Sequence, residues 1–203
     1  WFPGHMAKTK RQIKEVLPII DVVVELLDAR IPYSSRNPDC DDLVGSKQRI
    51  IVLSKSDLAD PVVTKKWILY FEKRYSCPVL SCNLSDWSDV KRIFRSLPNS
   101  ALSMPNRAWS KPRRLLVLGI PNVGKSTLIN SLHRSSRMKV ENRPGVTKHL
   151  QWIAVSKTVE LCDTPGVLWA NVKDEDIEMR LAAIGTIKDS LILHMVSVEV
   201  FGC

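Results

Sequence analysis

The chain has 203 residues and a formal net charge of +9, a length that suits one α/β domain with a substantial core or two small domains. Apolar residues make up 44% and charged residues 25% of it, as in an ordinary soluble globular protein. Five cysteines, none in a C-x-x-C pair, argue against a zinc site and a disulfide framework, and no apolar run is long enough to span a membrane. We therefore expect a cytoplasmic protein without a membrane partner. Nucleic acid is a natural partner, because Lys and Arg release counterions from phosphates.

The first half of the chain alternates predicted helices with predicted strands. We expect residues 1–5 to be non-helical because they are aromatic and contain Pro and Gly, and residues 6–17 to form a helix that Pro18 ends. The next elements are a strand at 19–27, a polar loop at 28–37, a strand at 50–53, a helix at 61–75, a strand at 79–80 and a helix at 86–97. This alternation predicts a parallel sheet with right-handed crossovers, and three prolines make 98–112 a connector.

A glycine-rich motif follows a predicted strand at 114–118. Residues 119–127 read Gly-Ile-Pro-Asn-Val-Gly-Lys-Ser-Thr and fit the pattern G-x-x-x-x-G-K-[ST], in which backbone N–H groups surround nucleotide phosphates. Leu128, Ile129 and Leu132 then repeat at helical spacing, so the motif lies between a strand and a helix, as its chemistry requires. The motif predicts that a nucleoside triphosphate is bound by Pro121, Asn122, Val123, Gly124, Lys125, Ser126 and Thr127.

The remainder of the chain predicts a pair of strands and a last helix. Residues 134–149 are polar, basic and without periodicity. Residues 150–155 and 159–162 are predicted to pair as strands, and a helical pattern extends over 174–184.

Asp163 follows the last predicted strand and begins the sequence Asp-Thr-Pro-Gly. P-loop enzymes need a second acid at such a strand end to hold Mg²⁺, and in GTPases it begins a D-x-x-G motif. The N–H of the motif's glycine, here Gly166, meets the γ-phosphate. GTPases also need a mobile threonine that reaches Mg²⁺ and the γ-phosphate, and Thr147 is the best candidate. The alternatives are an ordinary turn at 163–166 and a type II turn at Pro144-Gly145.

Selection of guanine requires an [NT]-K-x-D element, in which the Asp accepts from guanine N1–H and the 2-amino group while the Lys stem lies along the base. No such element follows Asp163, but Ser-Lys-Ser-Asp at 54–57 ends an upstream strand and supplies Lys55 and Asp57. Another strand end could offer a backbone N–H to guanine O6, and its residues are Ser81, Cys82 and Asn83. Base-reading elements then precede the phosphate-reading ones. A parallel sheet tolerates this order when the two ends of the ordinary fold are joined and new chain ends are opened elsewhere. The alternative is a plain strand-to-turn connection at 54–57.

Together these motifs resemble the circularly permuted GTPases of ribosome assembly, the YlqF-like family, over essentially the whole chain. The resemblance includes Trp-Phe-Pro-Gly-His-Met at 1–6, Asp-Ala-Arg-Ile-Pro at 28–32, Arg-Asn-Pro at 36–38 and Asp-Thr-Pro-Gly-Val at 163–167. It implies an α/β, three-layer P-loop GTPase fold with a mainly parallel sheet, circularly permuted so that the base-specificity motifs precede the P-loop. It also implies a factor that binds GTP and GDP with Mg²⁺ and hydrolyses GTP late in assembly of the large ribosomal subunit. Its partners would be the subunit precursor and its rRNA.

The resemblance further implies a division of the chain. Residues 1–185 would form the permuted GTPase domain, with a base-reading half at 1–112 and a P-loop and switch half at 113–185. Residues 186–203 would start a connection to a C-terminal RNA-binding domain that is absent from this chain. Ser54 replaces the Asn usual at that position in the family, a departure that affects one base contact. We expect a monomer.

Catalysis would consist of positioning and charge neutralisation around a loose transition state. Lys125 would bridge the β- and γ-phosphates, and Ser126 and Thr147 would ligate Mg²⁺ directly. Asp163 would hold that ion through water.

Val167 stands where small GTPases carry the glutamine that orients the attacking water, so another group must do this or intrinsic turnover is very slow. In similar GTPases an asparagine at the place of Asn122 coordinates K⁺, and in the family the His of the N-terminal motif, here His5, swings in to position water. His5 has suitable chemistry near neutral pH, and its alternative role is capping or packing beside the N-terminal aromatic residues. The alternative function is a nucleotide-gated RNA-binding module with negligible turnover of its own.

Three basic clusters are candidates for contact with rRNA, and the third lies beside the switch segment, where the GTP state could control RNA affinity. They are Lys8, Lys10, Arg11 and Lys14, then Arg107, Lys111, Arg113 and Arg114, and finally Arg134, Arg137 and Lys139. For the first cluster, the alternative is a helix face that is simply solvated.

Overall fold

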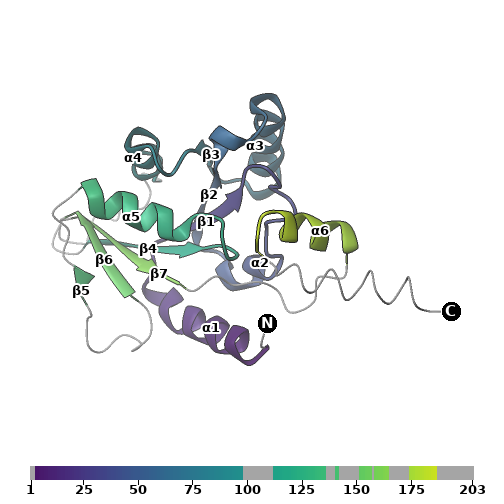
Figure 1. Ribbon diagram of the computed structural model, residues 1–203. Coiled ribbons are helices and arrows are strands. Elements are labelled where there is room, and N and C mark those ends of the chain that lie inside the picture. The colour runs from purple at the N-terminus through teal and green to yellow at the C-terminus, as the bar shows by residue number, and fades with distance from the viewer. Residues whose placement is uncertain are drawn as a thin grey trace.

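Seven strands form one sheet in the computed structural model (Figure 1), in the order β3-β2-β1-β4-β7-β6-β5. The structure describes residues 3–97, 112–135, 140–141, 151–156, 158–164 and 174–186. The strands are β1 (Val22–Asp28), β2 (Gln48–Ser54), β3 (Val79–Cys82), β4 (Arg113–Leu118), β5 (Val140–Glu141), β6 (Gln151–Ser156) and β7 (Val159–Asp163). Neighbouring strands from β3 to β7 are parallel, whereas β6 and β5 pair antiparallel with their neighbours.

Helices pack on both faces of this sheet. They are α1 (Pro3–Val16), α2 (Asp39–Val44), α3 (Pro61–Tyr75), α4 (Trp87–Arg95), α5 (Lys125–Ser135) and α6 (Glu175–Ala183), with short 3₁₀ turns η1 (Leu17–Ile19) and η2 (Ser56–Leu58). None of the described helices has the length and apolar character needed to cross a membrane.

Alternation of side chains along β1 shows how the layers are built. Val22, Val24 and Leu26 belong to a core that includes residues of α4, α5 and α6. Val23 contributes to a core with α1 and α2, and Leu27 to one with α3. The result is a sheet between two helical layers, which confirms the predicted three-layer α/β fold.

The middle of the sheet joins the two halves of the chain. β1 pairs in parallel with β4, from Val22 opposite Leu115 to Glu25 opposite Leu118. β4 is the strand that leads into the glycine-rich motif, so the residues upstream of this motif complete the same sheet. This arrangement confirms the permuted order of a single P-loop fold.

Strong local signals gave accurate helix starts, although α4 ends two residues and α6 one residue earlier than predicted. α3 has the bounds that were predicted, because Asp60 caps it by accepting from the N–H groups of Val62 and Val63, and Pro61 starts its first turn. α4 and α6 begin one residue later than predicted, since Asp86 and Asp174 are their N-cap residues.

Two predictions at weaker signals are wrong, and one short helix was missed. The helix expected at 6–17 already begins at Pro3, because proline is preorganised for a first helical turn. The strand expected from residue 19 begins at Val22, after the 3₁₀ turn η1 that contains Pro18. Helix α2 was not predicted, since its six residues are too few to show a periodic pattern. The connector at 98–111 and most of 134–149 lie outside the described residues.

We expect Phe71→Ala to lower the free energy of unfolding by about 3–5 kcal/mol, the usual cost of emptying a buried aromatic site. Phe71 is fully buried and lies 5.4 to 6.0 Å, centroid to centroid, from the rings of Trp67, Tyr70 and Tyr75. Urea unfolding measures the change. The control is Leu69→Ala in the same helix, where the side chain is 66% exposed and the change should stay within about 0.5 kcal/mol. Equal effects of the two substitutions would contradict the assigned core.

Candidate nucleotide-binding site

The glycine-rich loop at 119–124 turns the chain from the end of β4 into α5. A Cβ atom at Gly119 would lie 2.8 Å from Leu26 O and 2.8 Å from Val123 Cγ2, so only glycine fits there. Asn122 and Gly124 have positive φ values of 64° and 99°. The loop thus has the strained, side-chain-poor backbone that lets N–H groups approach phosphate oxygens.

Lys125 begins α5 and turns its amine back into the loop. Its Nζ donates to Gly119 O at 2.9 Å and to Ile120 O at 2.6 Å, and only 8% of the residue is exposed. Burial lowers the pKa of Lys125 to about 8, although the carboxylate of Asp163 opposes the shift. A buried cation inside the loop is what a nucleotide phosphate would neutralise.

Asp163 ends β7, the parallel neighbour of β4, and its Cα is paired with that of Val117. Burial raises the pKa of its carboxyl group above the usual value, while the charge of Lys125 and the backbone N–H of Thr164 lower it. Ser126 is exposed in the first turn of α5. A carboxylate and a hydroxyl beside a glycine-built phosphate loop match the few oxygen ligands that proteins give Mg²⁺ when phosphates and water complete its shell. The donor set therefore fits this ion.

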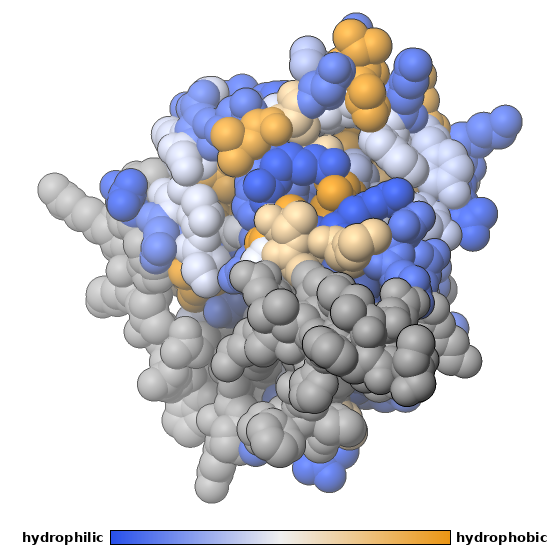
Figure 2. Space-filling model, turned by 45° about the vertical axis from the view of Figure 1, so that its right-hand side comes forward, coloured by the Kyte–Doolittle hydropathy of each residue, from blue (hydrophilic) through white to orange (hydrophobic). Residues whose placement is uncertain are grey.

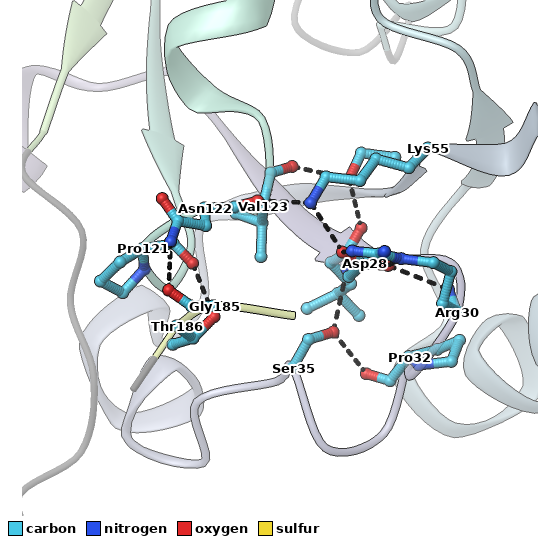
Figure 3. Close-up of polar contacts among 12 residues, drawn as sticks. Asp28, Arg30, Pro32, Ser35, Lys55, Pro121, Asn122, Val123, Gly185 and Thr186 are labelled. Carbon is cyan, nitrogen blue, oxygen red and sulfur yellow. Dashed lines mark hydrogen bonds and ion pairs between the residues drawn. The ribbon is translucent and has the colours of Figure 1, made fainter. Parts of the chain in front are cut away.

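The upstream Ser-Lys-Ser-Asp element lies directly against the phosphate loop (Figure 3). Ser54 is fully buried at the end of β2, and its Oγ lies 2.6 Å from Val123 O and 2.9 Å from Leu27 O. Lys55 Nζ donates to Asn122 O at 2.6 Å. Asp57 follows in η2 with an exposed side chain. Residues 67 and 69 positions apart in sequence thus meet, as the inverted motif order predicted.

Asp28, at the end of β1, holds Lys55 from the other side. Its fully buried carboxylate accepts from Lys55 Nζ at 2.9 Å and from Arg30 Nε and Nη2 at 2.9 and 2.8 Å. Burial alone would raise the pKa of Asp28, but the bonds from Arg30 and Lys55 hold it below its usual value. The sequence places Asp28 in a family motif but does not predict its contact with Lys55. An acidic residue at the carboxyl end of a buried strand is the feature that could have indicated it.

The segment that follows α6 also touches the phosphate loop, a contact that the sequence did not predict. Asn122 Nδ2 donates to Gly185 O, and Thr186 Oγ1 donates to Pro121 O at 3.0 Å. In Figure 3 the amide oxygen of Asn122 points away from Gly185. The predicted K⁺ ligand thus uses its nitrogen within the protein, and no described residue donates a hydrogen bond to its amide oxygen.

The strand end at 81–83 lies beside Ser54, but some of its polar groups already form hydrogen bonds within the protein. Cys82 pairs with Ser54 across β3 and β2, and burial raises the pKa of its thiol to about 12. The N–H of Asn83 donates to Asp89 Oδ2 at 2.8 Å, and Asn83 Oδ1 accepts from Ser85 N at 3.0 Å. This N–H already has an acceptor, so a bond from it to guanine O6 would need a change of partner.

Several predicted site residues lie outside the described part of the chain. Thr147, Gly166 and Val167 are among them, and Thr127 is exposed on the first turn of α5. The backbone of His5 belongs to α1, but its side chain is not described. The roles assigned to these residues stay predictions.

The basic clusters differ in how many of their side chains are exposed and how many form ion pairs with acidic residues. In the first cluster, Lys10 is paired with Asp39 and Arg11 lies 3.6 Å from Glu15, while Lys8 and Lys14 are exposed. In the second, Arg114 Nε lies 3.5 Å from Glu160 Oε2, Arg113 is half-buried, and Arg107 and Lys111 lie outside the described residues. In the third, Arg134 is exposed, and Arg137 and Lys139 lie outside the described residues.

The titration of Lys125 should be visible in stability. Its pKa in the folded chain is about 8, against 10.5 in an unfolded one, so the unfolded chain binds more protons in between. The parent's free energy of unfolding should therefore rise, relative to that of Lys125→Met, as pH increases from about 8 towards 10.5. Urea unfolding across this range, without added nucleotide, measures the difference. The exposed Lys8→Met should keep the parent's profile, and parallel profiles for Lys125→Met would refute the assignment.

Comparison with known proteins agrees with this geometry. A family model described as 50S ribosome-binding GTPase matches residues 114–201. Ribosome biogenesis GTPase A of Bacillus licheniformis is 47% identical to this chain over 207 aligned positions, which cover 100% of the chain and 72% of the relative.

Solved structures show the same likeness. A GDP-bound YlqF is 33% identical with a TM-score of 0.63 and is matched over 90% of this chain and 71% of its own. A GNP-bound YlqF from Thermotoga maritima is 31% identical with a TM-score of 0.63, over 97% of this chain and 77% of its own. Identity of 47% over the whole chain, together with a phosphate loop and an S-K-x-D element at the carboxyl ends of neighbouring strands, shows that the chain belongs to the ribosome biogenesis GTPase A (YlqF) family of P-loop GTPases.

Proposed function

We propose that this protein binds and hydrolyses GTP in the cytoplasm during late assembly of the large ribosomal subunit, and that the ribosomal particle stimulates hydrolysis. The main support is the contact between the upstream element and the phosphate loop, in which Ser54 and Lys55 meet the carbonyl groups of Val123 and Asn122. The names of the relatives and of the matching family model, which refer to ribosome biogenesis and to the 50S subunit, support the choice of partner.

In this proposal the two halves of the chain divide recognition between them. The base-reading half, 1–112, would bind guanine through Asp57, with the stem of Lys55 along the base. The phosphate-loop half, 113–185, would bind the phosphates through the loop N–H groups and Lys125, and the two halves would form one GTPase domain. The charge of Lys125 would stabilise the negative charge that develops on the phosphate oxygens.

Ser126, Thr147 and Asp163 would hold Mg²⁺, which neutralises phosphate charge in such sites. The water-orienting group would be His5, helped by K⁺ at Asn122 Oδ1. The rRNA of the subunit precursor would be the nucleic acid partner.

Val167 in place of a glutamine keeps a second function open, a nucleotide-gated RNA-binding module. That function would leave turnover negligible even with particles present.

We expect GTP to outcompete ATP for binding and Asp57→Ala to weaken GTP binding by about 10- to 150-fold, because hydrogen bonds to a charged group contribute about 1.5–3 kcal/mol. Competition against a fluorescent guanine nucleotide measures both effects. Glu72→Ala, which removes an exposed acid of α3, is the control and should leave affinity unchanged. If the Asp57 variant bound GTP like the parent, the guanine-reading role of residues 54–57 would be wrong.

We expect large ribosomal subunits to raise kcat more strongly in K⁺ than in Na⁺, and Asn122→Gly to remove the difference between the two cations. Glycine accepts the positive φ at this position, so the substitution deletes the amide without straining the loop. Thr186→Val is the matched control, because it breaks the other bond between the segment after α6 and the phosphate loop and leaves the amide in place. A K⁺ preference that survives in Asn122→Gly would remove Asn122 as the ligand. Turnover that stays negligible with particles in both salts would favour the RNA-binding module.

A further inference from the structure

A small pocket opens between the loop after β1, helix α3 and helix α6. It has a volume of about 160 Å³, and its lining includes Arg30, Pro32, Tyr33, Trp67 and Arg180. Figure 2 brings this side of the molecule forward, where hydrophilic and weakly polar side chains alternate with a few hydrophobic ones. The pocket contains none of the residues assigned above to GTP.

Tyr33 is the exposed end of an aromatic column that reaches into the core. Its side chain is 55% exposed, and its ring stacks on Trp67 with centroids 6.3 Å apart and an interplanar angle of 28°. Trp67 stacks in turn on the fully buried Phe71 at 5.6 Å. An exposed aromatic ring supported in this way loses little conformational freedom when a ligand stacks on it.

The backbone of the loop is fixed as well. Ser35 N donates to Ile31 O at 2.9 Å, Arg36 N donates to Tyr33 O at 3.2 Å, and Ser35 Oγ donates to Pro32 O at 3.1 Å. Tyr33 therefore sits on a hydrogen-bonded turn.

Among the described residues that line the pocket, the charged side chains are two arginines, Arg30 and Arg180. Two nitrogens of Arg30 are bound to Asp28, which fixes the plane of its guanidinium group. Arg180 is exposed on α6, and no carboxylate among the described residues pairs with it. A rigid aromatic face beside unneutralised arginine is the combination that binds unpaired nucleotides, through base stacking and phosphate contact.

We propose that this pocket binds an unpaired nucleotide of single-stranded RNA, with its base stacked on Tyr33 and its phosphate beside Arg180. The identity of the RNA rests on the proposed function, which supplies rRNA as the partner, while the recognition itself rests on the pocket. The arginines and the net charge of +9 favour RNA over an apolar peptide segment.

The test is the affinity of a short fluorescent single-stranded RNA for the full chain, measured by anisotropy over a range of salt concentrations. Tyr33→Ala should weaken binding by about 5- to 150-fold, because stacking on one aromatic residue contributes about 1–3 kcal/mol, and Tyr33→Phe should bind like the parent. Arg180→Gln should weaken binding and reduce the slope of log affinity against log salt by about 0.7, the value for one phosphate contact on a single strand.

The matched control is Trp87→Ala, which removes another exposed aromatic residue that has a lysine, Lys91, 5.9 Å from its ring. Trp87 lies on α4, away from the pocket, and its loss should not change RNA affinity. Equal affinity of Tyr33→Ala and the parent would overturn the proposal, as would an unchanged salt slope in Arg180→Gln. Competition by an acidic aromatic peptide at Tyr33, tighter than the RNA itself, would also overturn it in favour of a protein partner.

GTP hydrolysis by the same variants separates this proposal from the proposed function. Tyr33→Ala should keep the parent's basal hydrolysis while it loses RNA binding, which would support the pocket. A parent that binds RNA through Tyr33 and yet shows no particle-stimulated hydrolysis would contradict the proposed function and leave the pocket standing.

Discussion

The amine of Lys55 lies between the buried carboxylate of Asp28 and the carbonyl oxygen of Asn122. One side chain thereby joins the ends of β1 and β2 to the phosphate loop. Asp28 also binds the guanidinium of Arg30, so two cations compensate an acid that would otherwise be costly to bury. Because hydrogen bonds hold both Asp28 and the amine of Lys55, this lysine has a defined position before any nucleotide arrives. In the function proposed above, its stem would then lie along the base.

The order of the strands explains why this bridge can form in a permuted chain. From β1 the chain proceeds to β2 and β3 on one side of the sheet, while from β4 it proceeds to β7 on the other. The strand order therefore reverses between β1 and β4. Ligands of open α/β sheets bind at such a reversal, beyond the carboxyl ends of the strands. Asp28 is the last residue of β1 and Gly119 directly follows β4, so both lie at this point whichever loop of the fold carries the chain ends.

Sequence could predict the features that depend on local residues, and it could not predict those that depend on distant ones. The bounds of α3 follow from Asp60 and Pro61, and the phosphate loop follows from its own motif. The contact of Asn122 with Gly185 joins residues 63 positions apart and has no local signal. Likewise Glu25 interrupts an apolar strand, and only the fold shows that it is buried within 3.4 Å of both Arg36 and Arg49.

Asn122 meets two demands of the structure together, a positive φ and a side-chain donor to Gly185 O, and K⁺ would add a third in the function proposed above. Its φ of 64° is a conformation that glycine, asparagine and aspartate tolerate best. Glycine would accept the backbone but has no amide to donate to Gly185 O, and aspartate could bind a cation but has no N–H to give. With K⁺ at Oδ1, as proposed, the same amide would connect the cation to the end of α6. The asparagine of the phosphate loop would then serve as a joint between the nucleotide site and the segment that follows α6.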